Sequence, residues 1–453
     1  MDCFLHKELG TEASIRMLLV LCVFSLISCE KDLSFTGLKN LECDPKDPIQ
    51  NSHGVEGYTD KQSYAPGETI QFKIHSLTTS VELLIYRCGE RQELLYRVDN
   101  VATRVQNYNC RSYSMGCDWK TSHQLIVPQK SWKSGIYAAT LMNDYGEISY
   151  ISFVIKSLLP SRNKILVLAN TNTWQAYNNW SGQSFYLYGL NDRVKSANRL
   201  SFHRPNVFDS PIGDKGHLVN AELHLLRWLE KNQYEYDVVA DYDLHVQADI
   251  LEQYKVLILN VHPEYWSLAM RLQLSEYLDD GGRLMYLGGN GVYWKVALED
   301  GGMEVKKLGG SPAFGRGESG QWRDIGSPEA EILGVQFSPA GYGSYATYRV
   351  TEPGHWIFQG TGVKEGELFG RENHNGGGAS GHETDKMSDA SPVNTVLLAR
   401  GTNSNAGGAH MVYLENQAGG KVFSVGSISF TGSLEVDPVI STITKNVLDD
   451  FLK

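Results

Sequence analysis

Short, continuous apolar runs alternate with helical patterns from residue 161 to Trp294. Four of these runs predict strands that are buried on both faces, because polar residues do not alternate through them. They are Lys164–Leu168, Tyr236–Val239, Lys255–Asn260 and Arg283–Leu287. Helices are predicted over Gly216–Lys231, from Asp241 to near Tyr254, over Met270–Leu278 and over Val439–Leu452. In the third helix, Leu272, Leu274 and Leu278 are expected on one buried side. Strands that alternate with helices indicate a doubly wound parallel sheet.

The residues before and after this region show different hydrophobic patterns. Residues 57–157 contain many short alternating runs bounded by Gly and Pro, which predict an immunoglobulin-like β-sandwich. The expected strands are Thr69–His75, Val81–Arg87, Gly135–Leu141 and Ile148–Ile155, followed by a linker at Leu158–Ser161. After Trp294 the chain becomes Gly-rich, with late strands expected over Ala409–Tyr413 and Val422–Val425. The predicted fold class is therefore all-β plus α/β, with a Gly-rich, β-containing extension inside residues 161–453.

Polar clusters follow the predicted buried strands at the point where each strand ends. Residues Asn170–Trp180, His262–Trp266 and Gly288–Gly291 come after three of them, and Ser427–Leu434 follows a late one. Open α/β sheets bind their ligands at the carboxyl ends of their strands. We therefore expect the active site where these clusters meet.

The first residues indicate export rather than fold. Arg16 precedes the apolar run Met17–Ile27, which is too short to span a bilayer, and small residues follow it. This predicts a signal peptide over residues 1–28. The ending Leu-Ile-Ser-Cys resembles a bacterial lipobox, which would make Cys29 the lipid anchor of an envelope protein with a tether over residues 29–56. A plain signal peptide with a chance cysteine is the alternative.

If the chain is exported, its remaining cysteines are candidates for disulfide bonds. Four cysteines follow Cys29, and disulfides form readily in an oxidising compartment. We expect Cys110 to pair with Cys117 across a short loop, which leaves Cys43 to pair with Cys88. A zinc site is less favoured, because no CxxC spacing occurs.

Charge and motifs exclude several classes of function. The formal net charge is −11 without a basic block, so nucleic acid is not expected as a partner. The α/β region contains no cysteine and no GxSxG, so a covalent nucleophile has little support, and HExxH is missing.

What remains are polar side chains at the strand ends. They are Tyr177, His262, Glu264 and Asn290, with Tyr137 contributed by the β-sandwich. A carboxylate and phenolates are hard oxygen donors, which suit ferric iron better than zinc. The alternative is that these side chains are hydrogen-bonded structure, which is the commoner role of Tyr and Glu at such positions.

Several unusual segments resemble the N,N-dimethylformamidase large (beta) subunit family. They are TNTWQAYNNWSG (171–182), SFHRP (201–205), the segment 217–245, HPEYWS (262–267), GGRLMYLGGNGVYW (281–294) and VFSVGSISFTGSL (422–434). The resemblance covers most of the chain from about Tyr58 onward. It implies a β-sandwich followed by a domain similar to class I glutamine amidotransferases, without the cysteine of that class.

The resemblance also implies a mononuclear ferric iron site that hydrolyses the C–N bond of small or N-substituted amides. By motif, the iron ligands are Tyr137, Tyr177 and Glu264. The supporting catalytic residues are His262, Asn290 and Glu383, where His262 or Glu383 moves the proton between water and the departing amine. Phe430, Trp174 and Trp266 are expected to line the substrate pocket.

The chain departs from this family in ways that leave alternatives open. It lacks an N-terminal domain of the family's subunit, and no small partner subunit is evident; a homo-oligomer stays open. A non-catalytic or glycan-associated surface lipoprotein that keeps the fold without metal is the second interpretation. Four tryptophans near the strand ends suit sugar stacking: Trp174, Trp180, Trp266 and Trp294.

Overall fold

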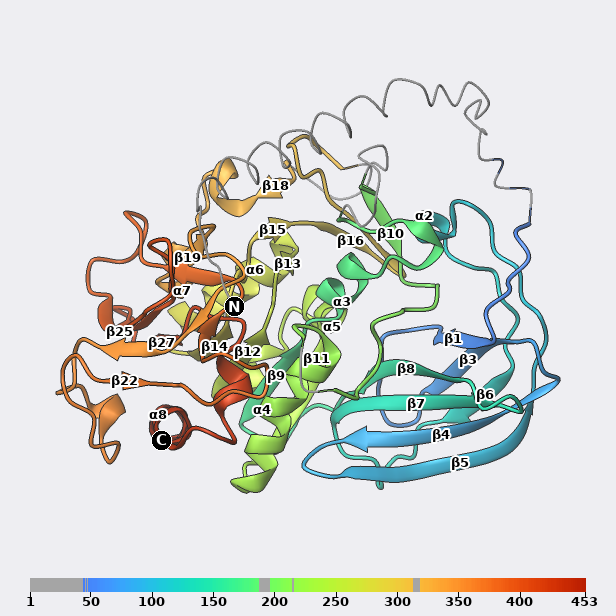
Figure 1. Ribbon diagram of the computed structural model, residues 1–453, viewed down its shortest axis with the longest axis horizontal. Helices are drawn as coiled ribbons and strands as arrows, with labels where there is room; N and C mark the ends of the chain where they lie inside the picture. The colour runs from blue at the N-terminus through green and yellow to red at the C-terminus, as the bar shows by residue number, and fades with distance from the viewer. Residues whose placement is uncertain (1–43, 45, 47, 187–195, 214–215, 313–317) are drawn as a thin grey trace, which may run out of the picture. The chain divides into compact units, whose positions relative to one another are not determined.

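The computed structural model describes residues 44, 46, 48–186, 196–213, 216–312 and 318–453. Residues 45–453 pack as one unit of mixed α/β structure, in which strands predominate and helices are few. Figure 1 shows the strands β1–β8 gathered in one region and a large sheet flanked by helices in the other. The domain boundaries near residues 157–161 stay a prediction.

The larger region is built on one nine-stranded sheet, in the order β11-β9-β12-β14-β27-β26-β25-β21-β22. The first five strands are mutually parallel: Tyr236–Ala240 (β11), Ile165–Ala169 (β9), Val256–Val261 (β12), Arg283–Gly288 (β14) and Lys421–Ser424 (β27). The other four are antiparallel: His410–Glu415 (β26), Val396–Gly401 (β25), Tyr348–Val350 (β21) and Leu368–Phe369 (β22). The six strands predicted for this region are confirmed, and the Gly-rich part continues the same sheet.

Both faces of the parallel strands are covered, which explains why these strands are apolar at every position. In β9, Leu166 and Leu168 contribute to one hydrophobic core, while Ile165 and Val167 contribute to the other. The first core also contains α5 (Asp241–Val246) and α6 (Leu268–Asp279), and the second contains α4 (Val219–Lys231) and α8 (Pro438–Phe451). Successive strand residues point to opposite faces, so a sheet covered twice needs apolar residues throughout.

One predicted helical face is wrong. In α6, Leu274 is fully buried and Leu278 is nearly so, but Leu272 is 52% exposed. Residues two positions apart lie far apart around a helix of 3.6 residues per turn, so Leu272 and Leu274 cannot share one narrow face.

Two sheets near the N-terminus share a third core. One sheet has the order β2-β8-β7-β4-β5 and the other β1-β3-β6. Their strands are Val55–Thr59 (β1), Ser63–Tyr64 (β2), Thr69–Ser76 (β3), Ser80–Cys88 (β4), Gln92–Ala102 (β5), His123–Ile126 (β6), Gly135–Asn143 (β7) and Ile148–Ile155 (β8). The four predicted strands are confirmed. The immunoglobulin-like assignment itself stays a prediction.

Short elements complete the chain. They are α2 (Ser112–Met115), α3 (Thr171–Tyr177), β10 (Arg199–Ser201), β13 (Tyr265–Trp266), β15 (Trp294–Lys295), β16 (Ala297–Glu299), β17 (Gly302–Glu304), β18 (Gly320–Gln321), α7 (Ala330–Leu333), β19 (Gln336–Ser338), β20 (Tyr345–Ala346), β23 (Ser380–Gly381) and β24 (Thr384–Lys386). Single 3-10 turns lie at Trp180–Gly182 (η1), Leu251–Gln253 (η2), Trp322–Ile325 (η3), Trp356–Phe358 (η4) and Phe430–Ser433 (η5).

The region formed by strands β1–β8 (the β-strand region) is attached to strand β11 at the edge of the large sheet. Ser134 Oγ accepts a hydrogen bond from Val238 N at 2.8 Å. Nearby, Arg87 Nη1 lies 2.7 Å from Glu230 Oε1 on α4, and Lys156 pairs with Asp243 on α5 at 2.5 Å. Because these contacts involve buried or half-buried charges, they orient the two regions specifically.

Both predicted disulfide pairs are wrong. Cys88 and Cys117 are free, buried thiols, so neither pairs with Cys43 or Cys110. Cys110 is itself disulfide-bonded. Burial, which disfavours the thiolate, raises the pKa of Cys88 and of Cys117 to about 12.

The export signal, Cys29 and Cys43 lie outside the described residues. Among the helices that the structure describes, none combines the length and the apolar character needed to cross a bilayer.

Leu274→Ala tests the assignment of the buried face of α6. We expect it to lower the free energy of unfolding by about 2–5 kcal/mol, because it leaves a cavity in a packed core. Leu272→Ala on the same helix is the matched control and should change it by less than about 0.5 kcal/mol. Urea unfolding measures both, and equal losses would contradict the assignment.

Candidate active site

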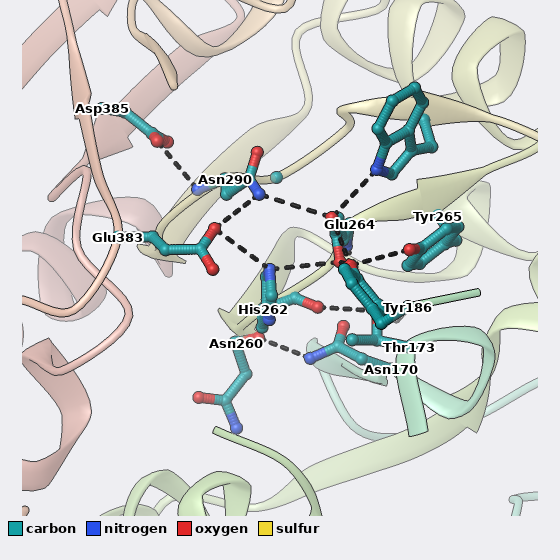
Figure 2. Close-up of polar contacts among 12 residues, drawn as sticks. Asn170, Thr173, Tyr186, Asn260, His262, Glu264, Tyr265, Asn290, Glu383 and Asp385 are labelled. Atoms are coloured by element: carbon teal, nitrogen blue, oxygen red, sulfur yellow. Dashed lines mark hydrogen bonds and ion pairs between the residues drawn. The ribbon is translucent and has the colours of Figure 1, made fainter. Parts of the chain in front are cut away.

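The polar clusters meet where the direction of chain connection reverses in the sheet. The chain passes from β9 to β11 on one side and then to β12 on the other, so β9 and β12 are neighbours with opposite onward connections. Ligand crevices of doubly wound sheets lie at such a point, beyond the carboxyl ends of the strands. The helix α3 begins directly after β9, and His262 begins the segment after β12. Figure 2 shows the side chains that converge there.

The segment after β9, which the sequence presents as a polar cluster, binds the segment after β12. Asn170 Nδ2 donates to Asn260 O at 2.6 Å, and Thr173 Oγ1 donates to His262 O at 2.8 Å. Asn172 Nδ2 donates to Tyr265 O at 3.1 Å. These side-chain amides and the hydroxyl bind backbone carbonyls at and beyond the end of β12, so they hold the two strand ends together.

The backbone is strained where β12 and β14 end. Val261 and Asn290 both have a φ of 51°, which is rare for any residue with a side chain and especially for a β-branched one. Gly289 approaches the backbone of Glu383 so closely that a Cβ there would lie 2.6 Å from the Glu383 carbonyl oxygen. Such strain is found where a functional side chain must be aimed, and here it turns the residues after both strands toward one point.

Glu264 lies at the centre of the cluster. Tyr186 Oη donates to its Oε2 at 2.6 Å and lies 2.8 Å from its Oε1, while Trp294 Nε1 donates to Oε1 at 3.0 Å. Tyr265 Oη donates to Tyr186 Oη at 2.7 Å. The Tyr177 ring stacks on the Tyr186 ring with centroids 4.2 Å apart. Two phenols therefore stand beside one buried carboxylate.

A second carboxylate faces the first across His262. Asn290 Nδ2 donates to Glu383 Oε2 at 2.6 Å and reaches Glu264 Oε1 at 3.4 Å. His262 Nε2 lies 3.4 Å from Glu264 Oε2 and 3.8 Å from Glu383 Oε2. Asp385 Oδ1 accepts from Asn290 N at 2.8 Å, which fixes the amide between the two carboxylates. Four residues predicted for the site, His262, Glu264, Asn290 and Glu383, are thus brought together (Figure 2).

Burial dominates the electrostatics of the cluster. It raises the pKa of Glu264 and of Glu383, and for Glu383 the neighbouring Glu264 raises it further. It also raises the pKa of the Tyr177 and Tyr186 hydroxyls, with Glu264 as the next cause. Lys307 is the cation that opposes these shifts in the two carboxylates, and burial lowers its own pKa to about 8. The cluster thus contains two carboxyl groups and two phenols, and a single lysine could not neutralise the negative charge of all four.

Comparison with known proteins identifies the family of the chain. The family described as N,N-dimethylformamidase beta subunit-like, C-terminal, matches residues 82–445, which is well over half of the chain. The chain belongs to this family. The N,N-dimethylformamidase beta subunit of Alcaligenes sp. is 31% identical over 425 residues, covering 74% of this chain and 55% of that subunit. The subunit of Paracoccus aminophilus is 30% identical with the same coverage. The chain thus spans about half the length of these relatives.

Among solved structures, the N-terminal domain of mmIFT52 matches 51% of this chain and 89% of its own at 11% identity, with a TM-score of 0.32. A similarity at this level does not establish a common fold.

The structure does not bring Tyr137, the first ligand inferred from the resemblance to this family, to Glu264. Its ring is fully buried in the core of the β-strand region, stacked against Trp132 and Phe153 at 5.1 and 5.9 Å. Its hydroxyl donates to Lys133 O at 2.6 Å. A side chain packed in this way has the structural role that the alternative interpretation proposed for it.

Tyr186 occupies the place expected of Tyr137, and the sequence reasoning missed it. It lies nine residues after Tyr177, in the connection that follows α3. A tyrosine-rich run in a segment without helical or strand pattern was the available signal. Lys307 was missed as well; its Nζ lies 3.8 Å from the centre of the Tyr186 ring. A lysine after a Gly-rich turn carries no pattern that distinguishes it from a surface residue.

The residues expected to line the pocket are core residues. Trp266 and Phe430 are fully buried, and Phe430 packs edge-to-face against Tyr348 with centroids 6.4 Å apart. Trp174 is buried and donates from Nε1 to Glu222 Oε1 at 2.7 Å. The four tryptophans considered for sugar stacking are each at most 9% exposed: Trp174, Trp180, Trp266 and Trp294. Buried indoles offer no face to a sugar ring, so this placement weakens the glycan interpretation.

The donor set of the cluster fits a hard cation such as iron. Tyr177, Tyr186 and Glu264 supply two phenol oxygens and a carboxylate, the donor type that ferric iron prefers. Among the described residues, neither ring nitrogen of His262 has a hydrogen-bond partner, and Asn290 Oδ1 has none either. Buried polar atoms without partners are costly, which indicates that the site is shaped for additional groups.

Arg204, from the SFHRP segment, holds the end of α3. Its guanidinium is fully buried and donates to four backbone carbonyls: those of Gln175, Asn178, Trp180 and Ser201, at 3.4, 2.9, 2.8 and 3.0 Å. Carbonyls at a helix C-terminus lack helical partners and carry partial negative charge, so a cation is favoured there. Arg204 thereby fixes the segment that carries Tyr177.

Arg204→Met tests this anchoring. Because it removes the donor for several buried carbonyls, we expect it to lower the free energy of unfolding by at least about 2 kcal/mol. Arg199→Met, at a half-exposed arginine of the neighbouring strand, should lower it by less than about 1 kcal/mol. Chemical denaturation measures both variants, and an unchanged stability of Arg204→Met would show that the carbonyls find other partners.

Proposed function

We propose that this protein hydrolyses the C–N bond of a small or N-substituted amide with a ferric ion held by Tyr177, Tyr186 and Glu264. The single observation that carries the proposal is the meeting of two phenols and a buried carboxylate at the switch point of the sheet. Membership of the N,N-dimethylformamidase beta subunit-like family supports the reaction class. A ligand set that included Tyr137 is not proposed, because that hydroxyl is bound to Lys133 O.

The chain's own residues determine how such a reaction proceeds. A ferric ion in this donor set supplies Lewis acidity toward an amide carbonyl and water. His262 Nε2 faces both carboxylates and makes no hydrogen bond to the described residues, so it can take the proton of an attacking water. Glu383, 3.8 Å away, can pass a proton to the departing amine. An amine leaves an amide poorly unless it is protonated, so this second transfer is essential.

Asn290 and the aromatic residues position these groups. Asn290 Nδ2 bonds Glu383 and also reaches Glu264, so it fixes the spacing of the two carboxylates. Trp294 Nε1 and Tyr265 restrain Glu264 and Tyr186. Preorganised dipoles of this kind stabilise charge without reorganising during the reaction. Because Glu264 and Glu383 are almost entirely buried, the arrangement suits a small substrate.

Several finer features accompany the proposal. We propose export to the cell envelope with a lipid anchor at Cys29, an immunoglobulin-like arrangement of the strands before residue 157, and a glutamine amidotransferase-like arrangement after residue 161. The family similarity makes catalysis the first hypothesis and the non-catalytic surface lipoprotein the second.

Tyr186→Phe tests the ligand set. Tyrosinate bound to ferric iron absorbs in the visible region, so the iron-loaded wild type should be coloured, and Tyr186→Phe and Tyr177→Phe should each lose intensity and iron content. Tyr137→Phe is the matched control and should retain both. The measurements are metal analysis and the visible spectrum of purified protein. Loss of the band in Tyr137→Phe, or an iron-free wild type after expression with iron, would contradict the proposal.

Glu383→Gln tests the proton transfer. Glutamine keeps the shape and can still bond Asn290 but cannot donate a carboxylic acid proton, so kcat should fall by about 10²–10⁴-fold. Iron content should stay at the wild-type value, which separates this loss from loss of metal. Amine release from N-methylated formamides and short N-alkyl amides is the measurement. Wild-type kcat in this variant would remove Glu383 from the mechanism.

A further inference from the structure

A second group of potential metal ligands lies outside the cluster around Glu264. It consists of His224 on α4, His374 in the Gly-rich segment after β22, and Glu435 just after η5. One ligand atom from each lies within 4.8 Å of the other two. His224 Nδ1 lies 3.9 Å from Glu435 Oε2, and the two imidazole rings stack at 5.0 Å with an angle of 8° between them.

We propose that His224, His374 and Glu435 bind a divalent transition-metal ion of the zinc class. Two imidazoles and one carboxylate form a ligand set that zinc commonly uses, and imidazole nitrogen disfavours magnesium and calcium. Three protein ligands leave the fourth position of a tetrahedral ion to water. Nothing in the amide hydrolase proposal uses these residues as iron ligands or proton carriers, so the two ions would be bound by separate sets of side chains.

The geometry needs only small movements of side chains. Zinc bonds of about 2.0–2.1 Å place tetrahedral ligand atoms about 3.4 Å apart. The separation between His224 Nδ1 and Glu435 Oε2 is already close to this value, and His374 is half-buried at the surface, where its ring can turn. Arg227 Nη1 lies 4.0 Å from the same Glu435 oxygen and competes with a cation. Arg227 is partly exposed and can turn to solvent, and its competition should make binding weaker than in a closed zinc centre.

Hydrogen bonds already hold two of the three segments together. His374 N donates to Gly432 O at 2.9 Å. Asn373 Nδ2 donates to Ser429 O at 2.7 Å and to Ser433 Oγ at 2.8 Å. These bonds fix the Gly-rich segment to η5 before any ion binds, so little conformational entropy is lost on binding.

A metal ion bound here would stabilise the segments that position residues of the proposed active site. It would join α4, η5 and the segment that leads to Glu383. Two residues before His224, the same helix carries Glu222, which accepts a hydrogen bond from Asn170 Nδ2 at 3.0 Å. The ion would therefore stabilise the folded protein and restrict the motion of Glu383, without contacting the substrate.

Zinc binding to the full-length protein tests the proposal in a background that lacks two of the three proposed iron ligands, the double variant Tyr186→Phe/Glu264→Gln. After chelator treatment, this background should bind one zinc per chain in competition with a chromogenic chelator. It should also melt at a higher temperature with zinc than with magnesium. Adding His374→Ala should weaken zinc binding at least about a hundredfold, since removing even an indirect support of a ligand costs about 10–100-fold. Cobalt should give a visible ligand-field spectrum that disappears with His374→Ala.

The matched control is His53→Ala, which removes an exposed histidine of the β-strand region and should leave zinc binding unchanged. Equal zinc affinity with and without His374, or no zinc bound to the background, would overturn the proposal. If the double variant does not fold, zinc bound beyond the iron in the wild type, with and without His374→Ala, decides between the same outcomes.

Discussion

The parallel pairing of β9 with β12 is the constraint on which the site depends. The chain leaves these neighbouring strands toward opposite sides of the sheet, so their carboxyl ends form a switch point, the place where doubly wound sheets bind their ligands. Tyr177 follows one strand and Glu264 follows the other, so residues 87 positions apart in the printed sequence face each other. The hydrogen bond from Thr173 Oγ1 to His262 O maintains this meeting.

The same strand ends concentrate acidic groups in an almost fully buried region. Glu264, Glu383 and two phenols share one buried volume, and Lys307 is the cation that acts on both carboxylates. Burying like charges is expensive unless a cation or protons compensate them. A hard cation among these oxygens relieves that cost, which gives the proposed iron site a physical reason that is independent of family similarity.

The surrounding residues hold the crevice rigid. Strained backbone at Val261 and Asn290 and the close approach at Gly289 are tolerated because the strands behind them are fully packed on both faces. Arg204 binds the carbonyls at the end of α3. His374, which together with His224 and Glu435 forms the second ligand group, lies in the segment that leads to Glu383. Together these supports fix the positions of a small number of polar groups, which the proposed reaction would require.

The sequence by itself determined the parallel strands and the edge at which the site lies. Continuous apolar runs such as Lys255–Asn260 are required by burial on two faces, and the polar residues after them mark the point where each strand ends. These are local consequences of solvent exclusion, so they can be recognised one segment at a time. The lack of a cysteine and of GxSxG in the α/β region was equally visible, since a motif can be read without knowledge of contacts.

Only the tertiary structure decided which distant side chains meet. Tyr137 and Tyr186 both stand in plausible segments, but β7 packs the first into a core, while the connection after α3 carries the second to Glu264. The free thiols of Cys88 and Cys117 and the exposed Leu272 were likewise decided by packing. Contacts between residues far apart in the chain depend on how whole elements pack, and no short pattern records that arrangement.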